Sequence, residues 1–358
     1  MEAVFLISRG EISGHHGGGK VRHDLLESAR RAGYHIVLMP GMGWRYFLHL
    51  AQLRIPRRST VILPYPGVPA IRQGGLLKGI ASLSEVGLLA AKKLSGRWRV
   101  YLYVYDLPIE QREAAGDFST HLLARFAESL LLGMSEVIGV MGEEMEDLMR
   151  RRYDWLTGRF VRYEFLPYYA PQIAKGTGPG YPRKVAFAGN LSQRRIGALA
   201  QLLPRKPGVK YCFYGPDGDW LAEVRDDFVW HGEFDASELS AVLNETADFG
   251  LLLYGASHMA QLRYLHMATT SKLFAYVYAG LPILTYSYRR LARIVTSQGL
   301  GFVFDDPAAL ADIVLNVDEQ MYKEIAGRVA LFAQGLASRN MLAEFVQAGS
   351  ALIRRTVS

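Results

Sequence analysis

Short apolar segments alternate with amphipathic helical segments along most of this chain, and this alternation is what most limits its fold. In the first half, strand-like runs fall at Ala3–Ser8, His35–Met39, Thr60–Leu63, Val100–Tyr105, Val137–Val140 and Phe160–Phe165. Helical patterns lie between them, at Gly19–Ala32, Gly75–Leu94, Ser119–Gly133 and Glu143–Tyr153. The alternation predicts an α/β protein, in which crossover helices cover both faces of a parallel sheet.

Proline and glycine gather near the middle of the chain, in Leu166–Pro171 and Gly176–Gly180, and mark a linker. After the linker the same alternation restarts at Lys184 and continues to Phe304. We therefore expect two doubly wound, Rossmann-like domains, at residues 1–168 and 169–340. A C-terminal helix is expected at residues 341–358, with the N-terminal domain as its candidate packing partner. Because parallel sheets bind ligands beyond the carboxyl ends of their strands, two such domains would face a central cleft.

Composition excludes several classes of protein. Half of the residues are apolar and 21% are charged, which argues against disorder. The single cysteine, Cys212, leaves no partner for a disulfide or a cysteine pair for zinc, which fits a reducing, cytoplasmic compartment. The apolar start of the chain is too short for a signal peptide. No window of about twenty residues is apolar enough to predict a membrane-spanning helix.

Positive charge is concentrated in one part of the N-terminal half. Between Arg30 and Arg99 there are twelve lysines and arginines and one acid, Glu85, whereas the whole chain carries a net charge of +7. Trp44-Arg45-Tyr46-Phe47 places aromatic residues beside a cation, as is typical of a membrane interface. We expect peripheral contact with the anionic inner face of the plasma membrane, against the alternative of a generally basic surface.

A glycine-rich segment follows the first strand, in SRGEISGHHGGGKVRHDLL. Gly18 and its neighbours would let the backbone approach a ligand closely, and the following helix would present its N-terminus to an anion. The spacing is looser than the dinucleotide fingerprint, so a nicotinamide cofactor is disfavoured. His15 and His16 are candidates for a catalytic base or a substrate contact, and a merely solvated loop is the alternative.

An acid stands at the carboxyl end of a predicted strand. Asp106 follows Val100–Tyr105 and would lie in the cleft of the proposed architecture. There it could take a proton from an attacking hydroxyl group. The alternative is that Asp106 only caps a turn or a helix.

The second half repeats a strand–glycine–helix junction. Gly189 and Asn190 follow Val185–Ala188, and Arg194 and Arg195 fall within the first turn or so of the next helix. Helix amides and a guanidinium would converge there on a phosphate. At the next strand end, Tyr214 would offer a ring on which a planar base could stack.

One lysine stands out in the apolar segment HMATTSKLFAYVYAGLPIL, where Lys272 follows Thr270 and Ser271. Thr270 or Ser271 can cap a helix whose first turn carries Lys272. Burial of an ammonium group without a partner is costly, so a bound diphosphate at the helix N-terminus would explain the lysine. The alternative is a lysine side chain that extends to solvent.

Together these segments resemble GT-B glycosyltransferases. The resemblance covers most of the chain and is strongest from Lys184 to Thr285, in FAGNLSQRR, FYGPDGDW, WHGEFDASEL and TTSKLFAYVYAGLPIL. It is closest to the Gtf3-type glucosyltransferases and the β-1,6-galactofuranosyltransferase-like proteins. It implies that Asn190, Arg194 and Lys272 contact the donor diphosphate and that Tyr214 lies near the base. The implied activity is transfer of a sugar from a nucleoside diphosphate, with UDP as the expected nucleotide, to a glycan or lipid-linked acceptor in bacterial cell-surface polysaccharide or glycoconjugate synthesis.

The chain departs from the retaining GT4-type pattern at two positions. Ala275 and Met267 stand where that pattern has glutamates, which favours an inverting transfer with Asp106, His16 or His15 as the base. No metal or other cofactor is expected, because the only D-x-D spacing, at Asp217 and Asp219, lies in a loop rich in glycine and proline.

Three other functions remain open at this point. The missing glutamates would also fit a non-catalytic GT-B partner or chaperone subunit. A nucleotide-sugar epimerase has the same two-domain build. A nucleic-acid-binding protein would use the basic block, but no nucleic-acid motif accompanies it, so none is expected as a partner. The sequence does not predict an oligomeric state.

Overall fold

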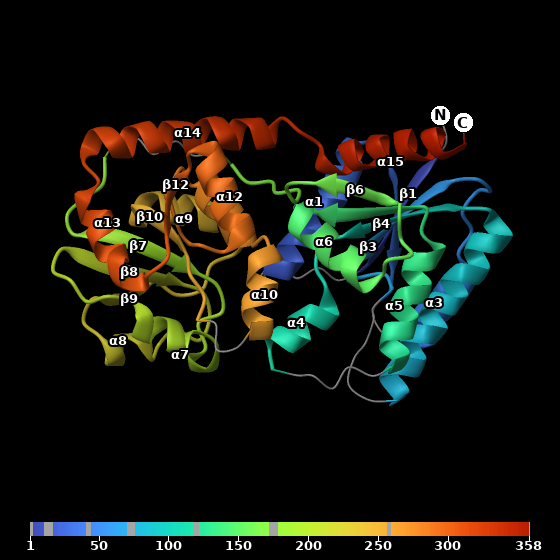
Figure 1. The fold of residues 1–358 in the computed structure, drawn as a ribbon, viewed down its shortest axis with the longest axis horizontal. Coiled ribbons are helices and arrows are strands. Elements are labelled where there is room, and N and C mark those ends of the chain that lie inside the picture. Colours follow the sequence, from blue (N-terminus) through green and yellow to red (C-terminus); the bar gives the residue numbers. More distant parts are fainter. Residues whose placement is uncertain are drawn as a thin grey trace.

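The structure is a computed structural model that describes residues 3–10, 17–40, 44–69, 76–116, 122–171, 178–255 and 259–357. In these residues it contains two six-stranded sheets, each flanked by helices, and the two domains lie side by side in Figure 1. This arrangement agrees with the predicted α/β class.

The N-terminal sheet is parallel throughout, with the strand order β2-β1-β3-β4-β5-β6. Its strands are β1 (Val4–Arg9), β2 (His35–Met39), β3 (Thr60–Tyr65), β4 (Arg99–Val104), β5 (Val137–Met141) and β6 (Phe160–Tyr163). Every residue of β3 and β5 is buried, as expected for strands covered by helices on both faces. The helices are α1 (Gly17–Arg31), α2 (Trp44–Gln52), α3 (Leu76–Gly96), α4 (Pro108–Ala114), α5 (Leu122–Met134) and α6 (Gly142–Arg152).

The C-terminal sheet is also parallel, with the order β12-β11-β10-β7-β8-β9. Its strands are β7 (Arg183–Ala188), β8 (Val209–Tyr214), β9 (Phe228–Trp230), β10 (Phe249–Leu252), β11 (Ile283–Tyr286) and β12 (Gly301–Phe304). The accompanying helices are α7 (Gln193–Leu202), α8 (Leu221–Val224), α9 (Leu239–Thr246), α10 (Met259–Met267), α11 (Ser271–Tyr278), α12 (Arg289–Gln298), the 3₁₀ turn η1 (Pro307–Ala309) and α13 (Leu310–Asn316).

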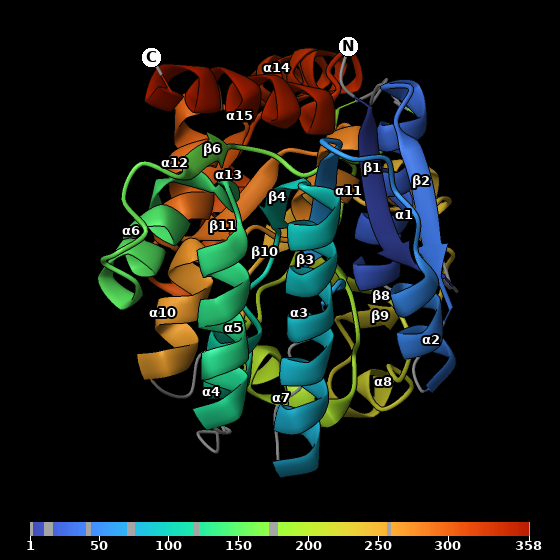
Figure 2. The same cartoon turned by 90° about the vertical axis from the view of Figure 1, so that its right-hand side faces the viewer.

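The last two helices, α14 (Glu319–Ala337) and α15 (Met341–Val357), run along one side of both domains (Figures 1 and 2). Helix α14 packs on α11, whereas α15 contacts β6, β5 and α1 of the N-terminal domain. Phe345 of α15 is buried among aromatic rings, with its ring centre 5.3 Å from that of Tyr103 and 6.4 Å from that of Tyr163. Asn340 donates to the carbonyl of Ser28 at 2.8 Å, which attaches the start of α15 to α1. The C-terminal helix therefore packs on the N-terminal domain.

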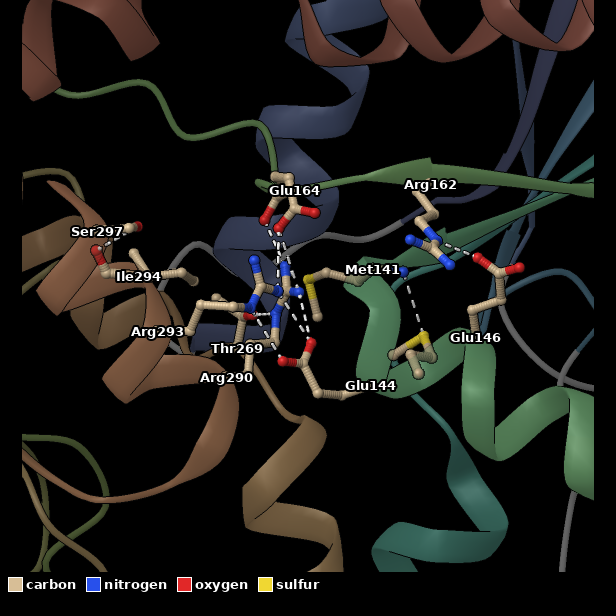
Figure 3. A network of polar contacts seen from close by, with 11 residues as sticks. Met141, Glu144, Glu146, Arg162, Glu164, Thr269, Arg290, Arg293, Ile294 and Ser297 are labelled. Carbon is tan, nitrogen blue, oxygen red and sulfur yellow. Dashed lines mark hydrogen bonds and ion pairs between the residues drawn. The ribbon is translucent and has the colours of Figure 1, made fainter.

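The two domains also meet directly, through α10 and α12 of the C-terminal domain. Helix α10 packs against α4 and α6, and α12 packs against α6. The side chains at this contact include Arg290 and Arg293 of α12 and the carboxylates of Glu144 and Glu164, which Figure 3 shows pointing toward one another. Polar and charged groups thus join the domains beside the linker.

We predict that Gly139→Ala destabilises the protein. A β-carbon at Gly139 of β5 would lie 2.6 Å from Cε2 of Phe345, so the ring and α15 must shift. We expect the free energy of unfolding to fall by about 1–3 kcal/mol, as for other overpacked cores, measured from the midpoint of urea denaturation.

Gly87→Ala is the matched control, because an added β-carbon there meets nothing within 4 Å. Alanine favours helix by up to about 1 kcal/mol over glycine, so this variant should be as stable as the parent or more stable. Equal midpoints for both variants would contradict the packing of α15 described above.

Candidate active site

The predicted donor-site residues come together at the carboxyl edge of the C-terminal sheet. Gly189 follows β7, and its backbone N–H donates to the carbonyl of Tyr214 at the end of β8 over 2.8 Å. Gly189 has φ +144°, and a β-carbon there would lie 2.9 Å from Cε of Lys272. Gly215 has φ +142°, and its β-carbon would lie 1.8 Å from the carbonyl oxygen of Gly189. The two glycines therefore allow the β7 and β8 loops and the lysine to occupy the same corner.

The Lys272 ammonium lies against two aromatic rings. Its ammonium nitrogen lies 3.9 Å from the ring centre of Phe187 and 4.7 Å from that of Tyr254. Among the described residues, no carboxylate pairs with it. Burial, with a smaller effect from the nearby charge of Arg195, lowers the pKa of Lys272 to about 7. A site that holds an unpaired ammonium at a helix N-terminus is arranged to receive an anion.

The start of α11 is organised as predicted. The side chain of Thr270 caps the helix by accepting from the backbone N–H of Lys272 at 3.3 Å. Ser271 is the first residue of the helix, and no acidic residue lies in the first turn to neutralise the helix dipole. Backbone amides, the dipole and the Lys272 ammonium therefore act on the same small volume.

At the start of α7 both Arg194 and Arg195 are exposed. The charge of Arg195 contributes to the lowered pKa of Lys272. The contact predicted between Arg194 and a diphosphate stays a prediction.

Asn190 shapes the loop before α7. Its side-chain oxygen accepts from the backbone N–H of Ser192 at 3.2 Å and from the Ser192 hydroxyl at 2.7 Å. Its amide donates to the carboxylate of Asp217 at 3.2 Å. In this conformation Asn190 orders two loops at the site, and its predicted contact with a diphosphate stays a prediction.

The role predicted for Tyr214 is not supported. The side chain is 1% exposed, and its ring stacks on His231 with centres 4.7 Å apart. The Tyr214 hydroxyl lies 2.9 Å from Oγ1 of Thr246. The side chain points into the domain core, so its ring does not offer an open face to a nucleotide base.

Asp106 lies at the carboxyl end of β4, where the N-terminal domain meets α10. Its Oδ1 accepts from the Tyr264 hydroxyl and from the backbone N–H of Leu107, each at 2.8 Å. Burial raises the pKa of Asp106, and these hydrogen bonds counteract part of that rise. Tyr264 therefore joins α10 to the candidate base, and Tyr254, a few residues past β10, lies against Lys272.

The other predicted residues have limited structural description. Gly18 lies in the first turn of α1. His15 and His16 lie outside the described residues. In the described part of the chain, no three histidine, cysteine, aspartate or glutamate side chains gather as metal ligands. In that same part, no helix is long and apolar enough to cross a membrane.

Three solved structures superpose on this protein over 98% or more of its length. The sucrose-phosphate synthase of Thermosynechococcus elongatus superposes with a TM-score of 0.61 at 13% identity, over all of both chains. HepE of Anabaena, solved in complex with UDP, gives a TM-score of 0.56 at 12% identity, again over all of both chains. WaaG, a glycosyltransferase involved in lipopolysaccharide biosynthesis, gives 0.53 at 11% identity, over 98% of this chain and 99% of that one.

The protein has the two-domain GT-B fold predicted for it and is an enzyme of the glycosyltransferase type. Residues 185–348 match the family described as glucosyltransferase 3-like, C-terminal domain. This segment includes Lys272, and the resemblance to Gtf3-type enzymes is confirmed.

We predict that Arg195→Met raises the pKa of Lys272, because a like charge disfavours the protonated ammonium and its removal favours it. The measurement is the pH dependence of covalent modification of Lys272 by an amine reagent, followed by mass spectrometry of its peptide. The parent should show a midpoint near pH 7, and Arg195→Met a higher one.

Arg194→Met is the matched control and should leave that midpoint unchanged. A shift of equal size in both variants would show that the two arginines act on Lys272 alike.

Proposed function

We propose that this enzyme transfers a sugar from a UDP-sugar to a glycan or lipid-linked acceptor in bacterial cell-surface polysaccharide or glycoconjugate synthesis. The observation that carries the donor assignment is the unpaired Lys272 ammonium at the capped N-terminus of α11, beside Gly189. The choice of UDP is supported by the HepE complexes with UDP and with UDP-glucose. The surface-glycan role draws on the stated role of WaaG.

In the proposed reaction, Lys272 and Arg195 neutralise the departing diphosphate. The bond between the anomeric carbon and the phosphate oxygen breaks, and the nucleoside diphosphate leaves with the electron pair. The ammonium, the guanidinium and the N-terminal amides of α7 and α11 stabilise the charge that develops on that oxygen. These charges come from the chain itself, and we propose a reaction that needs no metal ion.

Asp106 is the proposed base. It would take the proton of the acceptor hydroxyl as that oxygen attacks the anomeric carbon from the face opposite the leaving group, which inverts the configuration. Its raised pKa and its place at the domain contact support this role. Inversion is also favoured because Ala275 and Met267, which replace the glutamates of the retaining pattern, are buried in the core and provide no carboxylate.

We predict that UDP raises the melting temperature of the protein more than GDP, dTDP or CDP does, because a ligand that binds only the folded state stabilises it.

Lys272→Met should weaken UDP affinity about tenfold to 100-fold, since hydrogen bonds to charged groups contribute roughly 1.5–3 kcal/mol. Lys210→Met, at an exposed lysine on β8, is the matched control. Unchanged UDP affinity in Lys272→Met would refute the donor-site assignment.

We predict that Asp106→Asn lowers kcat by about 10²–10⁴-fold, the usual contribution of a general base, with little change in UDP affinity. A base acts when deprotonated, so activity of the parent should fall as pH drops through the raised pKa of Asp106. Tyr264→Phe removes a hydrogen bond that lowers this pKa and should move the acid limb to higher pH. An acid limb that persists in Asp106→Asn would assign the base elsewhere, to His15 or His16 first.

The acceptor would be reached through peripheral contact with the inner face of the plasma membrane. The basic block is divided in the structure: Arg57, Arg58 and Arg97 precede β3 and β4 and lie at the amino edge of the sheet. The neighbouring helices α3 and α5 instead begin on the carboxyl side of the sheet. They carry exposed apolar residues there, namely Leu76, Leu77, Ile80, Leu122 and Phe126. We propose that these first turns, with the exposed Lys78, form the membrane contact.

We predict that the protein floats with anionic liposomes at low salt and less at high salt. Leu77→Asp should remove flotation, because Leu77 is 82% exposed on the proposed face. Arg58→Glu, at the amino edge, should reduce it by less. No flotation of the parent at any salt concentration would remove the membrane proposal, and effective competition by duplex DNA would favour a nucleic-acid partner.

A further inference from the structure

Arg290 is a fully buried arginine that joins the two domains. It is the second residue of α12, its side chain is 0% exposed, and its partners come from both domains (Figure 3). Nη2 donates to the backbone carbonyl of Glu164 at 2.5 Å, and Nη1 lies 3.4 Å from carboxylate oxygens of both Glu144 and Glu164. Nε donates to the hydroxyl of Thr269, within its own domain.

The N-terminal domain provides a fitted space for this guanidinium. Gly142 begins α6 with φ +79°, and a β-carbon there would lie 1.4 Å from Nη1 of Arg290. A cation at a helix N-terminus is disfavoured by the helix dipole, so the two nearby carboxylates are needed to hold it there. Burial of the guanidinium without these carboxylates would be strongly destabilising. The position of Arg290 is therefore fixed by the N-terminal domain.

Thr269 connects this contact to the donor corner. It directly precedes Thr270, whose side chain caps α11 by accepting a hydrogen bond from the backbone N–H of Lys272. At the other end of the same segment, Tyr264 donates to Asp106 of the N-terminal domain. The stretch from Tyr264 to Lys272 is thus held by the N-terminal domain at two points, one through Asp106 and one through Arg290.

We propose that Arg290 is a positioning residue. Through Thr269 it holds the N-terminus of α11, and the donor bound there, at a fixed position relative to Asp106 of the N-terminal domain. This inference rests on the proposed function. Loss of the Arg290–Thr269 contact would misalign the sugar and the acceptor oxygen while leaving the phosphate-binding groups in place. Misplacement by about 1 Å can lower a rate as much as 100-fold, so kcat is the quantity expected to fall.

Arg293 provides an internal control. It forms ion pairs with Glu144 at 3.0 Å and Glu164 at 3.5 Å, the same two carboxylates that Arg290 contacts. Its side chain is 41% exposed and donates to Glu144 and Glu164, whereas the bond to Thr269 is made by Arg290. A variant at Arg293 weakens the attraction between the domains without breaking the link to α11.

The experiment compares Thr269→Val, Arg290→Lys and Arg293→Met in the full-length protein. Transfer kinetics, UDP affinity by calorimetry and the melting temperature are measured for each. We expect kcat to fall at least tenfold in Thr269→Val and Arg290→Lys, with UDP affinity within about threefold of the parent. Arg293→Met should keep kcat within about twofold while its melting temperature falls. The double variant Thr269→Val/Arg290→Lys should be no slower than Arg290→Lys alone, because both changes break one link.

Two failures are distinguishable. If the parent binds no nucleoside diphosphate, the proposed function is wrong, and the inference that rests on it falls too. If the parent binds UDP and transfers sugar, but Thr269→Val keeps the parent kcat, the positioning role alone is overturned. The same applies if Arg290→Lys and Arg293→Met lower kcat equally, since the effect would then follow domain attraction and not the link to Thr269.

Discussion

The donor corner depends on the absence of a side chain at Gly189. The Lys272 side chain fills the space where a β-carbon would lie, and the backbone of Gly215 approaches the Gly189 carbonyl from the other side. At this corner the Lys272 ammonium lies against two aromatic rings, and none of the described carboxylates pairs with it. The low pKa of Lys272 is the electrostatic consequence of this packing.

The local sequence predicted the features of the donor corner that depend on backbone geometry. The strand–glycine junction at Gly189 and the hydroxyl cap at Thr270 follow from turn and capping chemistry, which acts within a few residues. Side-chain direction was predicted less well. Tyr214 was expected beside a ligand, but its position in β8 points the ring into the core. The choice between Arg194 and Arg195 depends on the rotation of α7, which the sequence alone does not specify.

The order of strands and helices, and so the fold class, was also accessible from the pattern of apolar residues. The contact between the domains was not. Arg290 is more than 120 residues from Gly142, Glu144 and Glu164, and each residue has an ordinary local explanation as a helix start, a surface acid or a helix cation. Their shared role appears only when α12 packs on α6. Long-range electrostatic contacts of this kind leave no local periodicity in a sequence.

The core packing of α11 explains why its charged group stands at the very start of the helix. From Leu273 to Tyr278 every residue is buried, and Ala275 lies in the middle of this stretch. A carboxylate at Ala275 would need a partner in an apolar environment, whereas Ser271 and Lys272 in the first turn are only partly buried. The charge that this helix can offer to a donor is therefore confined to its N-terminal end. In the proposed reaction the base, Asp106, comes from the other domain, so the alignment of the two domains has chemical consequences.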